Sequence, residues 1–311
     1  MRKGFRVLIT DRCNMNCPTC FNRGIRNDQE MPVEDFFQLC SYLKNDGHIE
    51  RLKIMGGEPT VHNDFQEIIG IAQNNFDSIH IFTNGVNDEI AKVKMRKDDT
   101  IIYNLSCMGD QYPSAKLLPE QNFVHAYETR IDSKCSVDRI MRVISHVHSI
   151  VGDKIVINLT LDCTEDIFAN KKVLIAKWNA IVSFIEGLHV RYRVDHAIPY
   201  CFFVGSPMRI KVRGSFCPIA CAGLITPDLK LRHCNQTPVN LLSVRQNGRF
   251  IPWQILEQYI MCTHFEMQSK SLGKICKDCL FYGRKCDGGC FVFKPTITRE
   301  SIINATDLPL R

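Results

Sequence analysis

The 311-residue sequence lacks several features that would assign it to a broad class of proteins. It has no run of about 18 consecutive apolar residues, so we expect no membrane-spanning helix. Residues 1–4 lead directly into a predicted strand and offer no hydrophobic region of a secretory signal peptide. The formal net charge of +6 is spread along the chain without a Lys/Arg block, so nucleic-acid binding is not indicated. These absences favour a cytoplasmic protein that needs neither membrane nor nucleic acid.

Cysteine, by contrast, is abundant. The chain has 16 cysteines and no apparent secretory leader, so metal binding explains them better than a disulfide scaffold does. Cys13, Cys17 and Cys20 follow the predicted first strand with the spacing C-x3-C-x2-C. Three thiolates can hold three irons of a 4Fe–4S cluster, which usually takes four cysteines, and the fourth iron is then open to a substrate or cofactor. A zinc loop is the alternative, although zinc sites favour paired C-x2-C units.

A second motif follows the next predicted strand. Gly56-Gly57-Glu58-Pro59 comes directly after the segment 51–55. Adjacent glycines let the backbone approach a ligand and present its N–H groups without an obstructing side chain. The Glu58 carboxylate is a suitable partner for an ammonium group. By itself such a motif is usually only a turn, and its position after the cysteines is what makes it informative.

Strand-like and helix-like segments alternate through the first two-thirds of the chain. The predicted strands are 4–10, 51–56, 78–84, 100–106, 154–162 and 189–198. The predicted helices are 32–46, 64–75, 87–97, 136–150 and 171–187. Alternation of this kind predicts an α/β fold with a parallel sheet and right-handed crossovers.

The two motifs together resemble the signature of the radical S-adenosylmethionine (SAM) superfamily. The resemblance implies a partial (β/α)6 TIM-like barrel with its chemistry at the C-terminal ends of the strands. It also implies a 4Fe–4S cluster on Cys13, Cys17 and Cys20, with SAM bound through its amino and carboxylate groups to the open iron. In that family the reduced cluster splits SAM into methionine and a 5′-deoxyadenosyl radical. The turn 56–59 is similar to the motif that receives the amino group of SAM.

Two further strand ends resemble SAM-binding positions of the superfamily. Asn84 stands in Thr83-Asn84-Gly85, and Ser106 ends the predicted strand 100–106, where relatives often place a serine near the SAM carboxylate or ribose. The residues after Ser106 depart from the family, because Cys107-Met108-Gly109 replaces the aspartate that commonly precedes the glycine. Asparagine and glycine also end strands for purely structural reasons.

Other cysteines in the first two-thirds divide into two groups. Cys107, Cys163 and Cys201 fall at or just beyond predicted strand ends, where a thiol facing the cavity would donate a hydrogen atom to a substrate radical. The alternative is that each of these cysteines is simply a small apolar residue buried in the core. Cys40 lies among apolar residues of the predicted helix 32–46 and is expected in the core.

The last third of the chain holds a second group of cysteines. These are Cys217, Cys221, Cys234, Cys262, Cys276, Cys279, Cys286 and Cys290. Their arrangement resembles the SPASM extension of peptide-modifying radical SAM enzymes, which binds auxiliary Fe–S clusters. We therefore expect a radical SAM core over residues 1–205 and a smaller cysteine-rich Fe–S domain over residues 206–311.

The resemblance implies a ligand set for one or two auxiliary clusters. By order along the chain, the nearer cluster would be held by Cys217, Cys221, Cys234 and Cys290. Three irons of a farther cluster would be held by Cys276, Cys279 and Cys286. Residues 291–311 contain no further cysteine, so the farther cluster would take an unusual fourth ligand, keep an open iron or be absent. A four-thiolate zinc site on Cys276, Cys279, Cys286 and Cys290 is the alternative.

The resemblance also implies a reaction. The leading interpretation is hydrogen-atom abstraction from a ribosomally made peptide, giving a thioether, a carbon–carbon crosslink, a desaturation or an epimerisation, with auxiliary clusters accepting the remaining electron. The alternative is a small-molecule enzyme of cofactor or natural-product metabolism, and a third interpretation is a zinc-binding interaction protein.

We expect an external electron donor of the flavodoxin or ferredoxin type. Because only 12 residues precede Cys13, leader recognition would need a separate leader-peptide-binding protein or direct binding at the barrel mouth.

Overall fold

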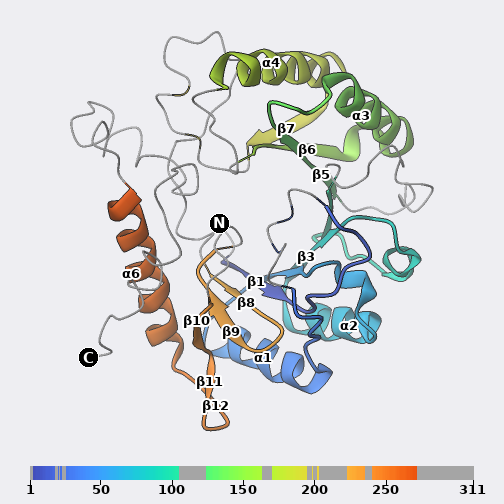
Figure 1. The fold of residues 1–311 in the computed structure, drawn as a ribbon. Coiled ribbons are helices and arrows are strands. Elements are labelled where there is room, and N and C mark those ends of the chain that lie inside the picture. The colour runs from blue at the N-terminus through green and yellow to red at the C-terminus, as the bar shows by residue number, and fades with distance from the viewer. Residues whose placement is uncertain are drawn as a thin grey trace. The chain divides into compact units, whose positions relative to one another are not determined.

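The computed structural model describes residues 3–17, 20, 22, 26–104, 124–162, 170–194, 198, 202, 223–234 and 240–271. The chain divides into two compact units (Figure 1). The first contains Met1–Ala126 and Ala220–Thr263, and the second contains Tyr127–Ile219 and His264–Arg311. The predicted domain boundary after residue 205 lies outside the described residues and stays a prediction.

A parallel sheet forms the centre of the first unit. Its strands, in spatial order, are β1 (Gly4–Leu8), β2 (Arg51–Met55), β3 (Ser78–Thr83) and β4 (Thr100–Asn104). Neighbouring strands are parallel throughout this set, with Gly4 opposite Arg51 and Arg51 opposite Ser78. Parallel neighbours end at the same edge of a sheet, so the segments that follow β1, β2 and β3 lie together there.

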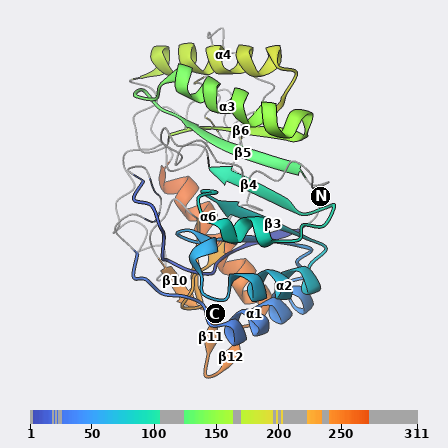
Figure 2. The same ribbon diagram turned by 90° about the vertical axis from the view of Figure 1, so that its right-hand side faces the viewer.

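Two helices cover one face of this sheet (Figures 1 and 2). They are α1 (Val33–Asn45) and α2 (Phe65–Asn75), which pack beside each other. The buried side chains of α1 include Phe36, Leu39, Cys40 and Leu43, at the three- and four-residue spacing of one helix face. Two short 3-10 helices, η1 (Pro59–Val61) and η2 (Asp88–Lys92), follow β2 and β3. Cys40 is fully buried, as its position among apolar residues predicts.

Residues from the last third of the chain extend the same sheet on the other side of β1. The added strands are β8 (Leu224–Ile225), β9 (Lys230–Arg232) and β10 (Asn240–Ser243). They are followed by a separate two-stranded hairpin, β11 (Arg245–Gln246) and β12 (Arg249–Phe250), and by the helix α6 (Trp253–Ser271). β8 runs parallel to β1, whereas β9 and β10 are antiparallel to their neighbours. The ring of Trp253 packs edge-on against Phe5 at a centroid distance of 5.5 Å. β1 therefore has a hydrogen-bonded partner on each side.

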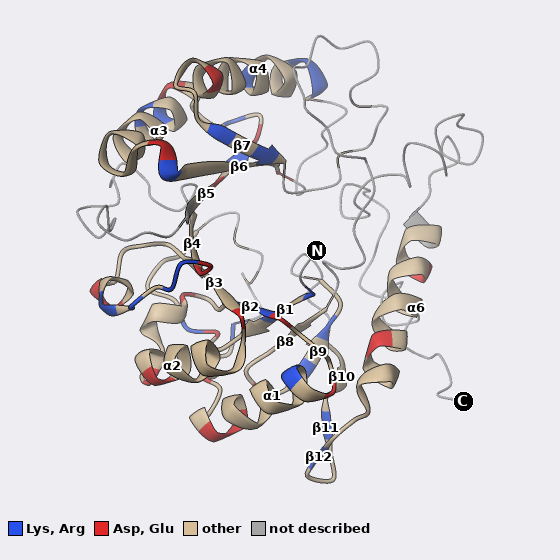
Figure 3. Ribbon diagram, turned by 180° about the vertical axis from the view of Figure 1, so that it is seen from behind, with Lys and Arg blue, Asp and Glu red and all other residues tan. Residues whose placement is uncertain are grey.

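The second unit repeats the alternation of strand and helix. Its elements are β5 (Val124–Ile131), which enters the unit at Tyr127, α3 (Val137–Val151), η4 (Gly152–Lys154), β6 (Ile155–Leu161), α4 (Lys171–Gly187) and β7 (Arg191–Val194). β6 and β7 are parallel, with Val156 opposite Arg191. Ser136 caps α3 by accepting a hydrogen bond from the backbone N–H of Arg139. Arg191 and Arg193 of β7 are both exposed, and they give β7 its blue segments in Figure 3, where Lys and Arg are blue.

The α/β prediction is confirmed, with two differences in detail. β5 was not among the predicted strands, although the buried residues Tyr127, Thr129 and Ile131 alternate with the less buried Glu128 and Arg130, which is the pattern of a strand. The predicted helix 87–97 is wrong, since only the 3-10 turn of η2 forms there. Within the described residues, no helix has the length and apolarity needed to cross a bilayer.

Candidate functional site

The segment after β1, residues 11–26, carries the three N-terminal cysteines and is called the cysteine loop below. Its beginning is fixed to the turn after β2 by two backbone hydrogen bonds. The N–H of Gly57 donates to the carbonyl of Thr10, and the N–H of Glu58 donates to the carbonyl of Arg12, each at 2.8 Å. The two sequence motifs are therefore in direct contact at one edge of the sheet.

Gly57 has to be glycine because of this contact. A Cβ atom at this position would lie 2.3 Å from the carbonyl oxygen of Arg12 and 2.6 Å from that of Asp11. Both neighbours are backbone atoms, which cannot rotate away as the end of a flexible side chain can. The sequence interpretation assigned the glycine pair to close approach by a ligand. The geometry gives Gly57 a second role, which is the close approach of the cysteine loop.

Glu58 is buried, with 1% of its surface exposed, and its carboxylate is held by four hydrogen bonds. Oε1 accepts from the N–H and hydroxyl of Thr60 and from the hydroxyl of Thr83, and Oε2 accepts from the N–H of Asn84 at 2.7 Å. Burial raises the pKa of the Glu58 carboxyl, and the donated hydrogen bonds act against that rise. A carboxylate can accept about four hydrogen bonds, two at each oxygen. The predicted pairing with an ammonium would therefore use Oε2, which accepts one hydrogen bond, and not Oε1, which accepts three.

Asn84 connects the third strand end to the cysteine loop. Its side-chain amide donates to the Oδ1 atom of Asn14 at 2.7 Å, while its backbone N–H is held by Glu58. Asn84 is buried, and Asn14 stands directly after Cys13. The structure thus brings together three groups of residues that the sequence predicted separately, the cysteines, the turn 56–59 and Asn84.

The thiols of Cys13, Cys17 and Cys20 are all partly exposed. The N–H of Met15 donates to the Sγ atom of Cys13 at 3.4 Å, and an Arg26 guanidinium N–H donates to the Sγ atom of Cys20 at 3.2 Å. Soft thiolates with N–H donors directed at sulfur are the donor set that Fe–S clusters use. Among the described residues, no three His, Cys, Asp or Glu side chains are close enough to hold a single metal ion. In a 4Fe–4S cluster each thiolate binds its own iron.

The guanidinium of Arg26 spans the loop. Its Nη1 donates to the carbonyl of Met15 at 2.9 Å while its Nη2 contacts Cys20. Partial burial lowers the pKa of Arg26, but the hydrogen bond to Cys20 and the neighbouring thiols raise it further, so that the net direction is upward. Arg26 therefore stays charged beside the thiols.

Three buried polar residues, Asp11, Asn22 and Arg232, join the stems of the cysteine loop to β9 and are called the clamp below. Asn22 donates to Asp11 at 2.9 Å, and Arg232 donates to the side-chain oxygen of Asn22 at 3.2 Å. Asp11 and Arg232 are each 4% exposed and Asn22 is fully buried. Burial raises the pKa of Asp11 and lowers that of Arg232, and the attraction between the two opposes both shifts. Cys234, a predicted auxiliary-cluster ligand, follows Arg232 by two residues and is partly exposed.

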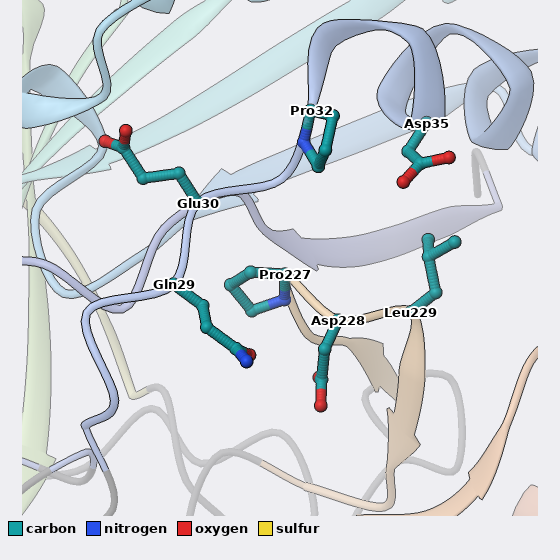
Figure 4. A pocket seen from close by; sticks show the side chains of 7 residues that line it. All are labelled: Gln29, Glu30, Pro32, Asp35, Pro227, Asp228 and Leu229. Atoms are coloured by element: carbon teal, nitrogen blue, oxygen red, sulfur yellow. The ribbon is translucent and has the colours of Figure 1, made fainter.

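A cavity of about 270 Å³ lies between the segment that precedes α1 and the turn between β8 and β9 (Figure 4). Its lining includes the carboxylates of Glu30, Asp35 and Asp228. Each is already paired, with Arg12 at 3.0 Å, Arg245 at 2.6 Å and Lys230 at 2.6 Å, respectively. The cavity therefore offers little uncompensated charge to a ligand, and we assign it no role.

Ten predicted site residues lie outside the described residues and stay predictions. They are Ser106, Cys107, Cys163, Cys201, Cys217, Cys221, Cys276, Cys279, Cys286 and Cys290. Conversely, the sequence interpretation missed Asp11, Asn22, Arg26 and Arg232 as parts of the site. Asp11, Asn22 and Arg26 lie close to the three cysteines in the sequence, and this could have indicated that they belong to the site. Nothing in the sequence indicated that Arg232 contacts Asn22.

Comparison with known proteins begins with a family model. The model of the "Radical SAM superfamily" matches residues 7–167. A probable GTP 3′,8-cyclase of Methanothermobacter marburgensis is 37% identical over 93 residues, which are 29% of this chain and 30% of that relative. The chain therefore matches less than a third of that relative's length.

Two solved structures are similar over most of the chain. The crystal structure of Streptococcus suis SuiB bound to the precursor peptide SuiA has a TM-score of 0.64 at 15% identity, covering 94% of this chain and 72% of that one. The structure of anSMEcpe with bound AdoMet has a TM-score of 0.63 at 14% identity, covering 97% and 94%. At these identities the likeness concerns the fold, and it confirms the predicted partial TIM-like barrel.

Proposed function

This chain belongs to the radical SAM superfamily, and from that premise we propose that it is a peptide-modifying enzyme that works by hydrogen-atom abstraction. It is an enzyme whose cofactors are a 4Fe–4S cluster and SAM, as the cysteine motif predicted. When bound, the cluster and SAM would together supply a radical able to remove hydrogen from C–H bonds that acid–base chemistry cannot activate.

The chain's own residues around these cofactors have separate tasks. Cys13, Cys17 and Cys20 would hold three irons, and the partly exposed loop leaves the fourth iron accessible. The turn 56–59 and Asn84 would receive the amino end of SAM beside that iron, because hydrogen bonds join both to the cysteine loop. The buried carboxylate of Glu58 orients the turn and the end of β3 at once.

The observation that carries the peptide proposal is the cysteine-rich last third. Eight cysteines from Cys217 to Cys290 exceed what SAM cleavage needs. The likeness to SuiB, solved with a precursor peptide, extends over 94% of this chain and supports the same interpretation. One or two auxiliary clusters on these cysteines would accept the electron left after bond formation.

The test is isotope transfer under anaerobic conditions. Reconstituted protein is incubated with SAM, a reductant and candidate peptides deuterated at side-chain and α positions, and mass spectrometry follows deuterium into 5′-deoxyadenosine and the mass of each peptide. Transfer of deuterium from a peptide to 5′-deoxyadenosine, together with a change in the mass of that peptide, supports the proposal. SAM cleavage without transfer from any peptide contradicts it. Iron analysis adds a second measurement, since about four irons indicate one cluster and about eight to twelve indicate auxiliary clusters.

A second candidate function is small-molecule synthesis in cofactor metabolism. The partial match to a probable GTP 3′,8-cyclase favours it. The same assay separates the two candidates when deuterated GTP replaces the peptide, because only the true substrate delivers deuterium. An external donor of the flavodoxin or ferredoxin type would supply the electron in either case. Only the peptide reaction would use a leader-peptide-binding protein, so stimulation by such a protein would favour the first candidate.

A further inference from the structure

The guanidinium of Arg26 is in hydrogen-bond contact with the thiol of a predicted cluster ligand, Cys20. Its Nη2 donates a hydrogen bond to the Sγ atom of Cys20 at 3.2 Å, and its Nη1 donates one to the carbonyl of Met15 at 2.9 Å. The N–H of the same Met15 donates to the Sγ atom of Cys13 at 3.4 Å. Arg26 thus connects two of the three thiols through the residue that lies between them in the loop.

The hydrogen bonds of Arg26 are directed at the cysteine loop and not at carboxylates. Within the described part of the chain, Arg26 forms no ion pair with Asp or Glu and is attracted to the thiols of Cys20, Cys13 and Cys17; the carboxylate of Asp11 is also attracted to it, without direct contact. Arg12 provides the contrast, because it belongs to the same loop but pairs with Glu30 at 3.0 Å. Two cations beside one cluster motif therefore have different partners.

We propose that Arg26 is a positioning residue that sets the reduction potential of the SAM-binding cluster, by donating a charge-assisted hydrogen bond to the Cys20 thiolate. Hydrogen bonds to cluster sulfurs and nearby charge are established determinants of Fe–S potentials. Reduction adds one negative charge to an already anionic cluster, and a cation in hydrogen-bond contact stabilises the reduced form more than the oxidised form. Arg26 therefore makes the cluster easier to reduce. The proposal holds for either candidate substrate, so it does not depend on the proposed function.

The test compares three variants of the reconstituted full chain by redox titration, with the reduced cluster measured by electron paramagnetic resonance. Arg26→Gln removes the charge, and we expect the ratio of reduced to oxidised cluster at a fixed solution potential to fall about three- to tenfold. Arg26→Lys keeps the charge without the planar pair of donors and should lie between Arg26→Gln and wild type. Arg12→Gln is the matched control, expected to stay within about twofold of wild type because Glu30 already neutralises its charge.

Two results overturn the proposal. One is an Arg26→Gln protein that keeps its iron and has the potential of wild type. The other is an equal loss in Arg12→Gln, which would show a general effect of loop charge. If Arg26→Gln does not retain iron, the titration is made on Arg26→Lys, and unchanged reducibility there counts against the hydrogen bond.

A measurement on unmutated protein tests the contact itself. Protein labelled with ¹⁵N in the arginine guanidinium groups is examined by pulsed electron paramagnetic resonance of the reduced cluster. A ¹⁵N coupling that disappears in Arg26→Lys supports the assignment. Its absence in the wild-type protein refutes the assignment whatever the variants do.

Discussion

The cysteine loop and the turn after β2 lie at the same edge of one sheet and contact each other, yet they use their polar side chains in opposite ways. The loop leaves Cys13, Cys17 and Cys20 partly exposed, so their sulfurs remain accessible to iron. The turn buries Glu58 and commits its carboxylate to four hydrogen bonds inside the protein. The comparison indicates that one motif exposes the predicted iron ligands, whereas the other forms an internal support for the loop that carries them. Substitutions in the two motifs should therefore separate activity from stability.

The largest expected effect is on activity. Cys13→Ala should abolish formation of 5′-deoxyadenosine, because one iron of the cluster loses its ligand. The free energy of unfolding of the iron-free protein should change by less than about 1 kcal/mol, since the thiol is partly exposed. Product analysis by mass spectrometry and urea unfolding measure the two quantities. Cys40→Ala is the opposite control, because Cys40 is fully buried, and it should lose stability while cleaving SAM. Persistent deoxyadenosine in Cys13→Ala would rule out the assigned ligand.

The largest effect on stability is expected at the clamp. Arg232→Ala leaves the buried side-chain oxygen of Asn22 without its donor and removes the stronger of the two cations that attract the buried carboxylate of Asp11, so it should cost about 3–5 kcal/mol in the free energy of unfolding. Lys230→Ala, two residues earlier, removes only a partly exposed ion pair with Asp228 and should cost at most about 1 kcal/mol. Urea unfolding of the two iron-free variants gives the comparison. Equal losses would mean that the clamp contributes nothing beyond a surface ion pair.

Glu58→Gln should have a smaller but measurable effect. One carboxylate oxygen becomes an NH₂ group facing donors from Thr60, Thr83 or Asn84, and an unmatched buried donor costs about 1–3 kcal/mol. Glu34→Gln, in the exposed first turn of α1, should change stability by less than about 0.5 kcal/mol. Thermal unfolding of the pair measures the difference. A Glu58→Gln protein as stable as wild type would show that the turn does not depend on the carboxylate.

Asn14→Ala should have the smallest effect. It removes the acceptor for the amide of Asn84 and should cost about 0.5–1.5 kcal/mol, because that amide can recover a water partner in a partly buried site. Since Asn84 lies beside the predicted SAM amino site, the KM for SAM should rise more than kcat falls. Steady-state deoxyadenosine formation over a range of SAM concentrations measures both constants. A fall in kcat alone would place the effect on the cluster and not on SAM binding.

The sequence predicted the parts of the fold in which local pattern and burial agree. α4 was predicted at residues 171–187, its observed bounds, because apolar residues such as Leu174, Trp178 and Ile181 mark one buried face. The predicted helix 87–97 was wrong because Ile90 and Val93, three residues apart, are both buried by a single 3-10 turn. Once those two side chains are covered, nothing else in the segment requires a longer helix.

The site was predictable where chemistry resides in short motifs and unpredictable where it depends on distant residues. The cysteine spacing and the turn 56–59 identified two halves of the site, and the contact between them is now explained by Gly57. Two other features had no local signal, namely the internal hydrogen bonds of Glu58 and the clamp. Both depend on which strands become neighbours, since Thr83 is 25 residues from Glu58 and Arg232 is 210 residues from Asn22.

That separation of 210 residues has a consequence for biosynthesis. The cysteine loop emerges from the ribosome early, but the arginine that completes the closure of its stems is made only after about three-quarters of the chain. Until β9 has been synthesised and has paired beside β8, Asn22 lacks the donor that Arg232 provides, and Asp11 lacks the stronger of its two cationic partners. Iron delivered before that point would meet a loop whose stems are incompletely closed. The chain therefore couples closure of the loop that carries its predicted metal ligands to the synthesis of β9, because contacts this distant in sequence form late in folding.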